Sequence, residues 1–261
     1  MLDLTYWSQA YFLFLLLVAR LGGFLTAAPF FGSRNIQPSL RFFLALLLAL
    51  TFLPLFPAAA YRPPEALLPL ALVLVRELVL GVVLGYAAGV ILSAFTVAGQ
   101  VLDLEIGFGI VNVFDPQSGV QAPLLGNLLY LMALVILLSS DGHHLLLQGL
   151  WTSWQAVPPG GFWGRPGLLW EAVRATIVMF IAGIEIAAPV LASIFLADLA
   201  LAVVARTMPQ LNIFVVGLPL KSILGLGVLA LSLPAFGVLL RALLTEVQNS
   251  FAAILALLPP A

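Results

Sequence analysis

The sequence predicts an all-α membrane protein with about six long, partly kinked helices, and three observations support this fold class. Hydrophobic residues make up 63% of the 261 residues and charged residues only 8%, whereas a soluble domain carries about a quarter charged residues. Apolar runs of the length that crosses a bilayer recur along the chain. Prolines and polar turn residues separate these runs and interrupt some of them.

The composition also limits the function classes. The net charge of −1 provides no basic surface for nucleic acid, and the absence of cysteine excludes disulfides and thiolate metal sites. His143 and His144 are neighbours, and we expect that neighbours cannot ligate one metal from one helix face. The sequence contains no catalytic motif or phosphate-binding loop. We therefore expect a non-enzymatic protein without metal or cofactor, which acts in or at the membrane.

Two helices are expected before the first proline-rich break, over about residues 6–29 and 40–56. Pro29 cannot continue the first helix, which contains Arg20. The second helix has roughly 17 residues and reaches only about 26 Å, which is short of a hydrocarbon core about 30 Å thick. Four prolines follow this helix and break the chain.

A third helix is expected over about residues 66–98, and it carries a row of small residues. These residues recur at four-residue steps and share one helix face: Gly81, Gly85, Gly89 and Ser93. Such a face lets the backbone of another helix approach closely. Chance is the alternative, since glycine is common in membrane helices. Close packing is the favoured interpretation, and the predicted packing positions are Gly81, Gly85 and Gly89.

A fourth helix is expected over about residues 124–138, and an amphipathic helix follows it at once. Ser140 or Asp141 is the expected N-cap of this next helix. Its large apolar residues fall on one face, and its glutamines and Thr152 fall on another. We therefore expect it to lie along an interface and not to span the membrane.

Two long helices are expected after a loop rich in proline and glycine, over about residues 168–207 and 218–251. Pro189 and Pro234 should kink them. Glu185 lies near the middle of an apolar run in the first of these helices. An ionised carboxylate facing lipid there would cost about 3 kcal/mol, so we expect Glu185 to face protein or water, or to be protonated. A functional or inter-subunit role is favoured over a purely structural one.

The other charged residues in apolar surroundings also need partners or access to water. Arg76 and Glu77 are adjacent on a helix and do not face each other, so each needs another partner. Glu171 and Arg174 are three residues apart and can pair on one helix face. Snorkelling towards the interface is expected for three residues near helix ends: Arg174, Arg206 and Lys221. The predicted inter-subunit or intramembrane polar positions are Arg76, Glu77, Glu185, Asp198, Arg206 and Lys221.

Residues 106–120 do not fit a helix. Their glycines permit backbone angles that a helix does not use, and Pro116 has no N–H to donate. Five large apolar side chains nonetheless lie between Phe108 and Phe114. A water-exposed loop is the alternative, but so many apolar side chains are costly to leave in water. Irregular backbone at membrane depth occurs where protein surrounds it or where it lines a cavity, so we expect an irregular, re-entrant, plug-like loop.

Three motifs point to one protein family. They are Asp115-Pro116-x-Ser118-Gly119, Asp141-Gly142-His143, and the long segment from Arg206 to Lys221. Together they closely resemble the FliR family, which comprises the R subunits of the flagellar type III export gate. The nearest relatives of that family are the corresponding subunits of virulence injectisomes. The resemblance covers the whole chain in length and in motif order, and the last motif is long and specific.

The resemblance implies a membrane complex and a set of partners. A single R subunit would assemble with several P and Q subunits into a helical export channel in the bacterial inner membrane, at the flagellar basal body. The A and B export subunits would be associated with it, and unfolded flagellar proteins would pass through the channel. The resemblance further implies a P-like portion over 1–157 and a Q-like helical hairpin over 158–261.

The resemblance also implies that the glycine-rich segment before Asp115 and Pro116 plugs the closed pore. Relatives can place phenylalanine where this chain has Ile110 and Val113, whereas the phenylalanines here stand beside those positions. The plug would cover about 106–120, and its predicted residues are Ile106, Gly107, Phe108, Gly109, Ile110, Val111, Asn112, Val113, Phe114, Asp115 and Pro116.

Three alternative functions are open at this point. The chain can be the injectisome counterpart of the flagellar subunit. It can be a proton-coupled small-molecule transporter that uses Glu185 or Asp198, which predicts an internal repeat with broken helices in both halves. It can also be a scaffold that nucleates assembly without lining the pore. The sequence has one irregular segment with no counterpart in its second half, which favours the export channel over the transporter.

Overall fold

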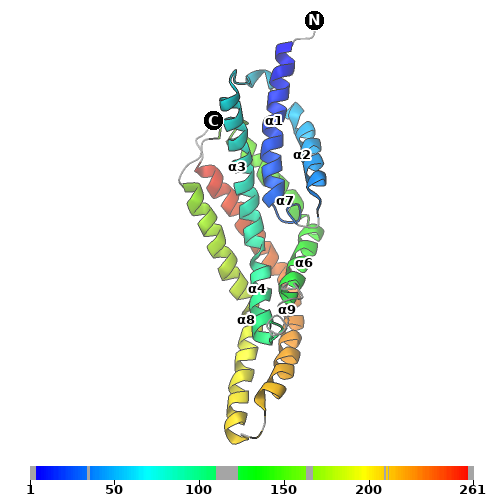
Figure 1. The fold of residues 1–261 in the computed structure, drawn as a ribbon, viewed down its shortest axis with the longest axis vertical. Coiled ribbons are helices and arrows are strands. Elements are labelled where there is room, and N and C mark those ends of the chain that lie inside the picture. The colour runs from blue at the N-terminus through cyan, green and yellow to red at the C-terminus, as the bar shows by residue number, and fades with distance from the viewer. Residues whose placement is uncertain are drawn as a thin grey trace. The chain divides into compact units, whose positions relative to one another are not determined.

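The structure is a computed structural model that describes residues 4–33, 36–109, 123–162, 167–208, 210 and 212–257. The helices in these residues are α1 (Leu4–Ala27), α2 (Pro38–Phe52), α3 (Leu67–Leu92), α4 (Ala94–Ile106), α6 (Leu124–Ser139), α7 (Gly142–Ala156), α8 (Gly167–Thr207) and α9 (Ile213–Ala256), with the short 3-10 helices η1 (Leu53–Leu55) and η2 (Ala58–Ala60) (Figure 1). The described residues contain no strand.

This architecture confirms the predicted fold class of an all-α membrane protein. Within the described ranges, 5 helices are long and apolar enough to cross a membrane, and there are up to 6 if the bent pair α6 and α7 forms one span. A short break separates α6, which lies in unit 2, from α7, which lies in unit 1.

The expected third helix is divided into two helices, which corrects its predicted end. α3 stops at Leu92 and α4 starts at Ala94, because Ser93 has ψ of −6°, far from the helical value of about −42°. α4 then continues past the predicted end and stops at Ile106. Gly107 ends it in the left-handed region with φ of 96°, a conformation that glycine adopts without a Cβ penalty.

The amphipathic character predicted for the segment after α6 is confirmed by α7. Leu146, Leu150 and Trp154 are buried, whereas Gln148 and Thr152 are exposed. The expected N-cap is confirmed, since Asp141 occupies that position of α7. Its backbone has φ of 55° and its side chain makes no capping hydrogen bond, which differs from the usual extended N-cap whose side chain accepts a helical N–H.

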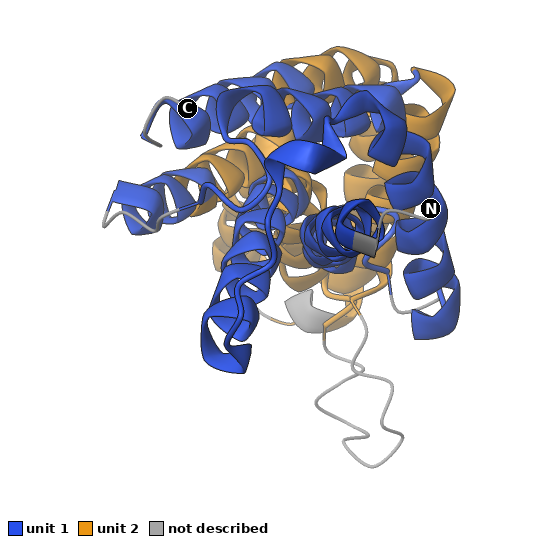
Figure 2. Cartoon of the chain, turned by 90° about the horizontal axis from the view of Figure 1, so that it is seen from above, with its two compact units in different colours: residues 1–90, 141–175, 244–261 blue, residues 91–140, 176–243 orange. Residues whose placement is uncertain are grey.

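The two long C-terminal helices are each continuous. α8 and α9 run for 41 and 44 residues, and each continues past its internal prolines, which are Pro189 in α8 and Pro219 and Pro234 in α9. α9 begins at Ile213, earlier than the expected start near residue 218. The chain forms two compact units (Figure 2), which are residues 1–90, 141–175 and 244–261 for unit 1 and residues 91–140 and 176–243 for unit 2. The division after residue 157 that the resemblance implies stays a prediction.

Each unit has its own apolar core. In unit 1 the fully buried apolar residues of α1 are Leu13, Leu16, Leu17, Leu21, Phe24 and Leu25, and the ring of Phe24 meets that of Phe251 with centroids 6.5 Å apart. In unit 2 the rings of Phe95 and Phe236 pack edge to face at 5.7 Å. Many other large apolar side chains are exposed, including Leu67 at 83% and Leu231 at 82%. A chain with this surface needs lipid or other protein around it.

Candidate functional site

The most buried charges of unit 1 are Arg20 on α1 and Glu77 on α3, and they form an ion pair. Arg20 Nε lies 2.6 Å from Glu77 Oε2, and Arg20 Nη2 donates to Glu77 Oε1 at 3.1 Å. Neither side chain has any exposed surface. Two parallel hydrogen bonds are the arrangement in which a guanidinium binds a carboxylate most strongly. Each charge is therefore compensated without water.

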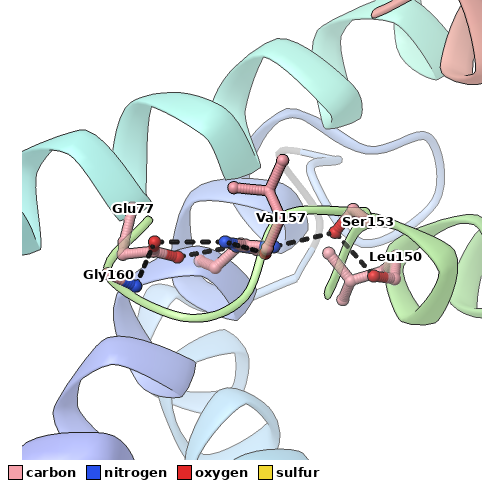
Figure 3. Close-up of polar contacts among 6 residues, drawn as sticks. Glu77, Leu150, Ser153, Val157 and Gly160 are labelled. Atoms are coloured by element: carbon pink, nitrogen blue, oxygen red, sulfur yellow. Dashed lines mark hydrogen bonds and ion pairs between the residues drawn. The ribbon is translucent and has the colours of Figure 1, made fainter. Parts of the chain in front are cut away.

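The remaining polar atoms of this pair bond to α7 and the residues that follow it. Arg20 Nη1 donates to Ser153 Oγ at 3.2 Å, and Arg20 Nη2 also donates to the Val157 carbonyl at 3.0 Å. The N–H of Gly160 donates to Glu77 Oε1 at 2.8 Å, and Figure 3 shows this contact beside Ser153 and Val157. These five residues, which we call the Arg20–Glu77 cluster, join α1 and α3 to the end of α7.

Tyr61 is a titratable group next to this cluster and lies between η2 and α3. Burial and the Glu77 carboxylate raise the pKa of the Tyr61 hydroxyl, and the Arg20 guanidinium lowers it; the net direction is upward from the ordinary value. The hydroxyl is therefore neutral over the physiological pH range.

Arg20 also lies over the ring of Trp154, with 5.8 Å between its guanidinium carbon and the ring centroid.

The cluster holds helices together and has no free group for catalysis. Its charges are bonded to each other and are closed off from solvent, whereas a catalytic acid or base must reach a substrate. The need of Glu77 for a partner is predicted from the sequence, whereas its partner Arg20 is identified only by the structure. An arginine inside an apolar run was the available signal, because such a charge is almost always paired.

The glycines of α3 lie against the backbone of α1. A Cβ on Gly81 would overlap the carbonyl oxygen of Arg20, and one on Gly85 would lie 2.5 Å from the carbonyl oxygen of Phe24. A Cβ on Gly89 would lie 2.6 Å from the carbonyl oxygen of Ala27. Only a residue without a Cβ fits at such distances, and the resulting close approach brings Glu77 within reach of α1.

Lys221 and Asp198 form an ion pair in unit 2, and the expected snorkelling of Lys221 stays a prediction. Lys221 Nζ lies 2.6 Å from Asp198 Oδ1, and the side chains are 22% and 43% exposed. Both residues lie roughly two turns from the hairpin between α8 and α9. In a helical hairpin, residues that lie the same number of residues before and after the connecting loop stand opposite each other. The pairing of Lys221 with Asp198 therefore follows from the hairpin of α8 and α9.

Replacing Lys221 with methionine should have only a small effect on the stability of the isolated chain. Because both partners are partly exposed, the pair contributes about 1 kcal/mol or less. Thermal unfolding in detergent micelles, at low and high salt, measures this contribution. Arg206→Met, which removes an exposed cation from α8, is the matched control. A loss of several kcal/mol for Lys221→Met would contradict this prediction and show that water and salt screen the ion pair far less than its exposed surface implies.

The other predicted polar positions differ in exposure. Arg76 is half-buried on α3, while Glu185 and Arg206 are exposed on α8. The possible pairing of Glu171 with Arg174 is not formed, since no ion pair joins these two described residues and Glu171 Oε2 is buried without a hydrogen-bond partner. The roles of Arg76, Glu185 and Arg206 in an assembled complex stay predictions.

The predicted plug lies only in part within the described residues. Ile106 is fully buried, and its side chain lies against Gly225 of α9. Ser222 Oγ donates to the Ile106 carbonyl at 3.4 Å. Gly107, Phe108 and Gly109 follow as a turn at the end of α4. The remaining predicted plug residues lie outside the described part of the chain: Ile110, Val111, Asn112, Val113, Phe114, Asp115 and Pro116.

The ligand atoms of Asp141, His143 and His144 lie close together, contrary to the geometric argument from the sequence. These atoms are all within 4.8 Å of one another, and Asp141 stands at the N-cap, outside the helix that contains the two histidines. The side chains of Asp141 and His144 are 80% and 70% exposed. Exposed groups of this kind commonly occur without a metal ion, and the arrangement has no shell of buried partners to orient the ligands.

The chain is similar to proteins of flagellar assembly over most of its length. The family described as "Bacterial export proteins, family 1" matches residues 11–247. A flagellar biosynthetic protein FliR of Bacillus subtilis is 40% identical over 212 residues, which is 80% of this chain and 81% of that protein. FliR of Aquifex aeolicus is 32% identical over 225 residues, covering 82% and 83%. FliR of Escherichia coli is 28% identical over 253 residues, covering 97% and 95%.

The matched region includes both units of the structure, from α1 to α9. Its apolar helices agree with a multi-pass membrane protein. This chain belongs to family 1 of the bacterial export proteins, the family of the flagellar biosynthetic protein FliR.

Proposed function

We propose that this chain is the non-enzymatic R subunit of a flagellar type III export gate in the bacterial inner membrane, and that residues 106–120 plug the closed pore. The subunit assembles with P and Q subunits into a channel, with the A and B export subunits nearby. Unfolded flagellar proteins pass through this channel. The names of the relatives, which are flagellar biosynthetic proteins, favour the flagellar role over the injectisome role.

The observation that carries the plug assignment is that one residue close to each end of the segment is packed in the core of unit 2. Ile106 is fully buried at the end of α4, and Leu125 in the first turn of α6 is 2% exposed, although its neighbour Leu124 is 64% exposed. These two core positions support a location against protein for the apolar side chains of the segment, which are costly to leave in water.

The proposed mechanism is steric and hydrophobic. Apolar side chains from Phe108 to Phe114 close a narrow pore to water and ions, as hydrophobic constrictions do in channels. Gly107, with φ of 96°, is a backbone position at which the chain can turn without a Cβ clash. An arriving substrate displaces the segment and opens the pore.

Deleting residues 107–120 should make the assembled gate leaky. The measurement is the flux of ions and small solutes across membranes of cells that express this chain with its P and Q partners, with assembly checked by co-purification. We expect a leak with intact assembly, because the deletion removes the apolar seal. An intact complex that stays tight would contradict the plug assignment and leave a packing loop.

A point variant keeps this test decisive if the deletion prevents assembly. Phe108 and Phe114 replaced by serine keep the chain length but remove two apolar side chains of the seal. Phe42 and Phe43, which are 57% and 62% exposed on α2, provide the matched double replacement by serine outside the segment. A leak for the first variant and not for the second supports the plug. Equal behaviour of both assembled variants would contradict it, and loss of assembly for the first variant alone would favour the scaffold role.

The transporter alternative has less support from the geometry. Asp198 is bonded to Lys221, so its carboxylate is already compensated by a cation. The described helices show a single bent pair of the kind found in transporters, formed by α6 and α7. A repeat architecture would place a second such pair in the other half of the chain.

A further inference from the structure

A single buried aspartate connects the two flanks of residues 110–122, which include most of the proposed plug. Asp103 lies near the end of α4 and is 5% exposed. Its Oδ1 and Oδ2 atoms each accept the N–H of Leu125 at 3.1 Å, and Oδ2 also accepts the N–H of Gly126 at 3.3 Å. Leu125 and Gly126 belong to the first turn of α6. The side chain thus bonds one flank of the segment to the other.

The start of α6 needs such a partner. The first N–H groups of a helix have no acceptor within the helix, and the N-cap position of α6 is Pro123, which makes no side-chain capping bond. A carboxylate from α4 takes the place of the local cap. Its negative charge is also favoured at the positive end of the helix dipole, and hydrogen bonds to a charged acceptor are about twice as strong as neutral ones.

The backbone of Asp103 holds the other flank. Its carbonyl oxygen accepts the N–H of Gly109 at 3.0 Å, which closes the turn after Gly107. One residue therefore bonds to the last described residue before the segment 110–122 and to the first turn of the helix after it.

Two glycines allow α4 and α6 to approach closely enough for these bonds. A Cβ on Gly99 would overlap the backbone nitrogen and Cα of Gly126. A Cβ on Gly126 would lie 3.2 Å from the carbonyl oxygen of Thr96. The two helices are therefore in backbone contact one turn away from Asp103, and the carboxylate reaches α6 without an intervening water.

We propose that Asp103 is the positioning residue of the gate, which fixes the spacing between α4 and α6 and thereby the position of the plug. This role rests on the proposed function of residues 106–120. Opening of the gate by separation of the two flanks requires that the bonds from Asp103 to Leu125 and Gly126 break. The strength of these bonds sets how often the flanks separate in the absence of substrate.

Asp103→Asn is the test substitution, because it keeps the size of the side chain and removes the charge. An amide accepts with one oxygen only and presents an NH2 group to the N–H groups of α6, so at least one of the present bonds is lost. A hydrogen bond to a charged group contributes about 1.5–3 kcal/mol, which corresponds to at least a tenfold rise in the separated state. We expect a leak several times above that of the wild type, with assembly retained.

Glu105→Gln is the matched control, since it removes an exposed carboxylate from the same helix. It should leave the leak unchanged. A tight Asp103→Asn complex alongside a leaking complex with residues 107–120 deleted would overturn the role of Asp103 and leave the plug intact. Conversely, a tight deletion variant would contradict the plug itself.

A distance measurement tests Asp103 independently of the plug. The chain has no cysteine, so cysteines introduced for Leu104 and Leu128, which are 74% and 46% exposed, can be spin-labelled selectively. The full chain in detergent micelles should give one narrow distance, and Asp103→Asn should broaden or lengthen it, whether or not the complex assembles. An unchanged distance distribution would overturn the proposal.

Discussion

Replacing Arg20 with alanine should lower the free energy of unfolding by about 3–5 kcal/mol, which is the typical cost of breaking a buried ion pair. The substitution leaves the Glu77 carboxylate buried, with the Gly160 N–H as its only remaining recorded donor. It also removes the donors to Ser153 and Val157. Thermal or denaturant unfolding of the purified chain in detergent micelles measures the loss, and reduced accumulation in membranes should accompany it.

The double variant Arg20→Met with Glu77→Leu separates the effect of an unpaired charge from that of lost packing. Replacing both charges with apolar side chains of similar size is often neutral or stabilising for buried pairs. We expect recovery of most of the lost stability, though not all, because the Val157 carbonyl and the Gly160 N–H lose their recorded partners. A double variant as unstable as Arg20→Ala would contradict the view that the uncompensated charge dominates.

Gly81→Ala should separate α1 from α3 and is the second large expected effect. The added Cβ would overlap the carbonyl oxygen of Arg20, and a backbone atom within a packed helix cannot move aside cheaply. Overpacking typically costs about 1–3 kcal/mol. The shift would also strain the bonds between Arg20 and Glu77, so we expect a loss at the upper end of this range, measured by unfolding in detergent micelles.

Gly22→Ala is the matched control, because a Cβ at Gly22 of α1 meets no atom within 4 Å. Alanine is favoured over glycine in a helix by about 1 kcal/mol, so this variant should be as stable as the wild type or slightly more stable. Equal destabilisation by Gly22→Ala and Gly81→Ala would show that the loss does not come from the contact between α1 and α3.

Much of the fold follows from patterns that operate within one element. The apolar runs predict the helices because each helix satisfies its own backbone hydrogen bonds. The four-residue spacing of Gly81 and Gly85 predicts a close packing face, but it does not identify α1 as the partner. The break at Ser93 was missed because no proline or glycine stands there, and the departure of ψ is confined to one residue.

The polar contacts were harder to predict because they depend on tertiary packing. Arg20 and Glu77 are 57 residues apart, and Asp103 and Leu125 are 22 apart. In both cases the only local signal is a charge inside an apolar helix. The pair of Lys221 with Asp198 was more accessible, since both residues lie at similar distances from one hairpin. It was missed because the role of Lys221 was predicted from its position near a helix end, without considering which residues of the neighbouring helix lie opposite it.

The most direct test of the central claim is whether an exported protein touches residues 106–120 during passage. A photoreactive amino acid in place of Phe108 should crosslink to a flagellar protein stalled in the assembled gate. The same amino acid in place of Leu68, which is 72% exposed at the start of α3, should not. This account predicts crosslinks between the stalled protein and the amino acid at position 108, and no crosslinks from the amino acid at position 68. An export-competent gate without such crosslinks at Phe108, Val113 or Phe114 would contradict it.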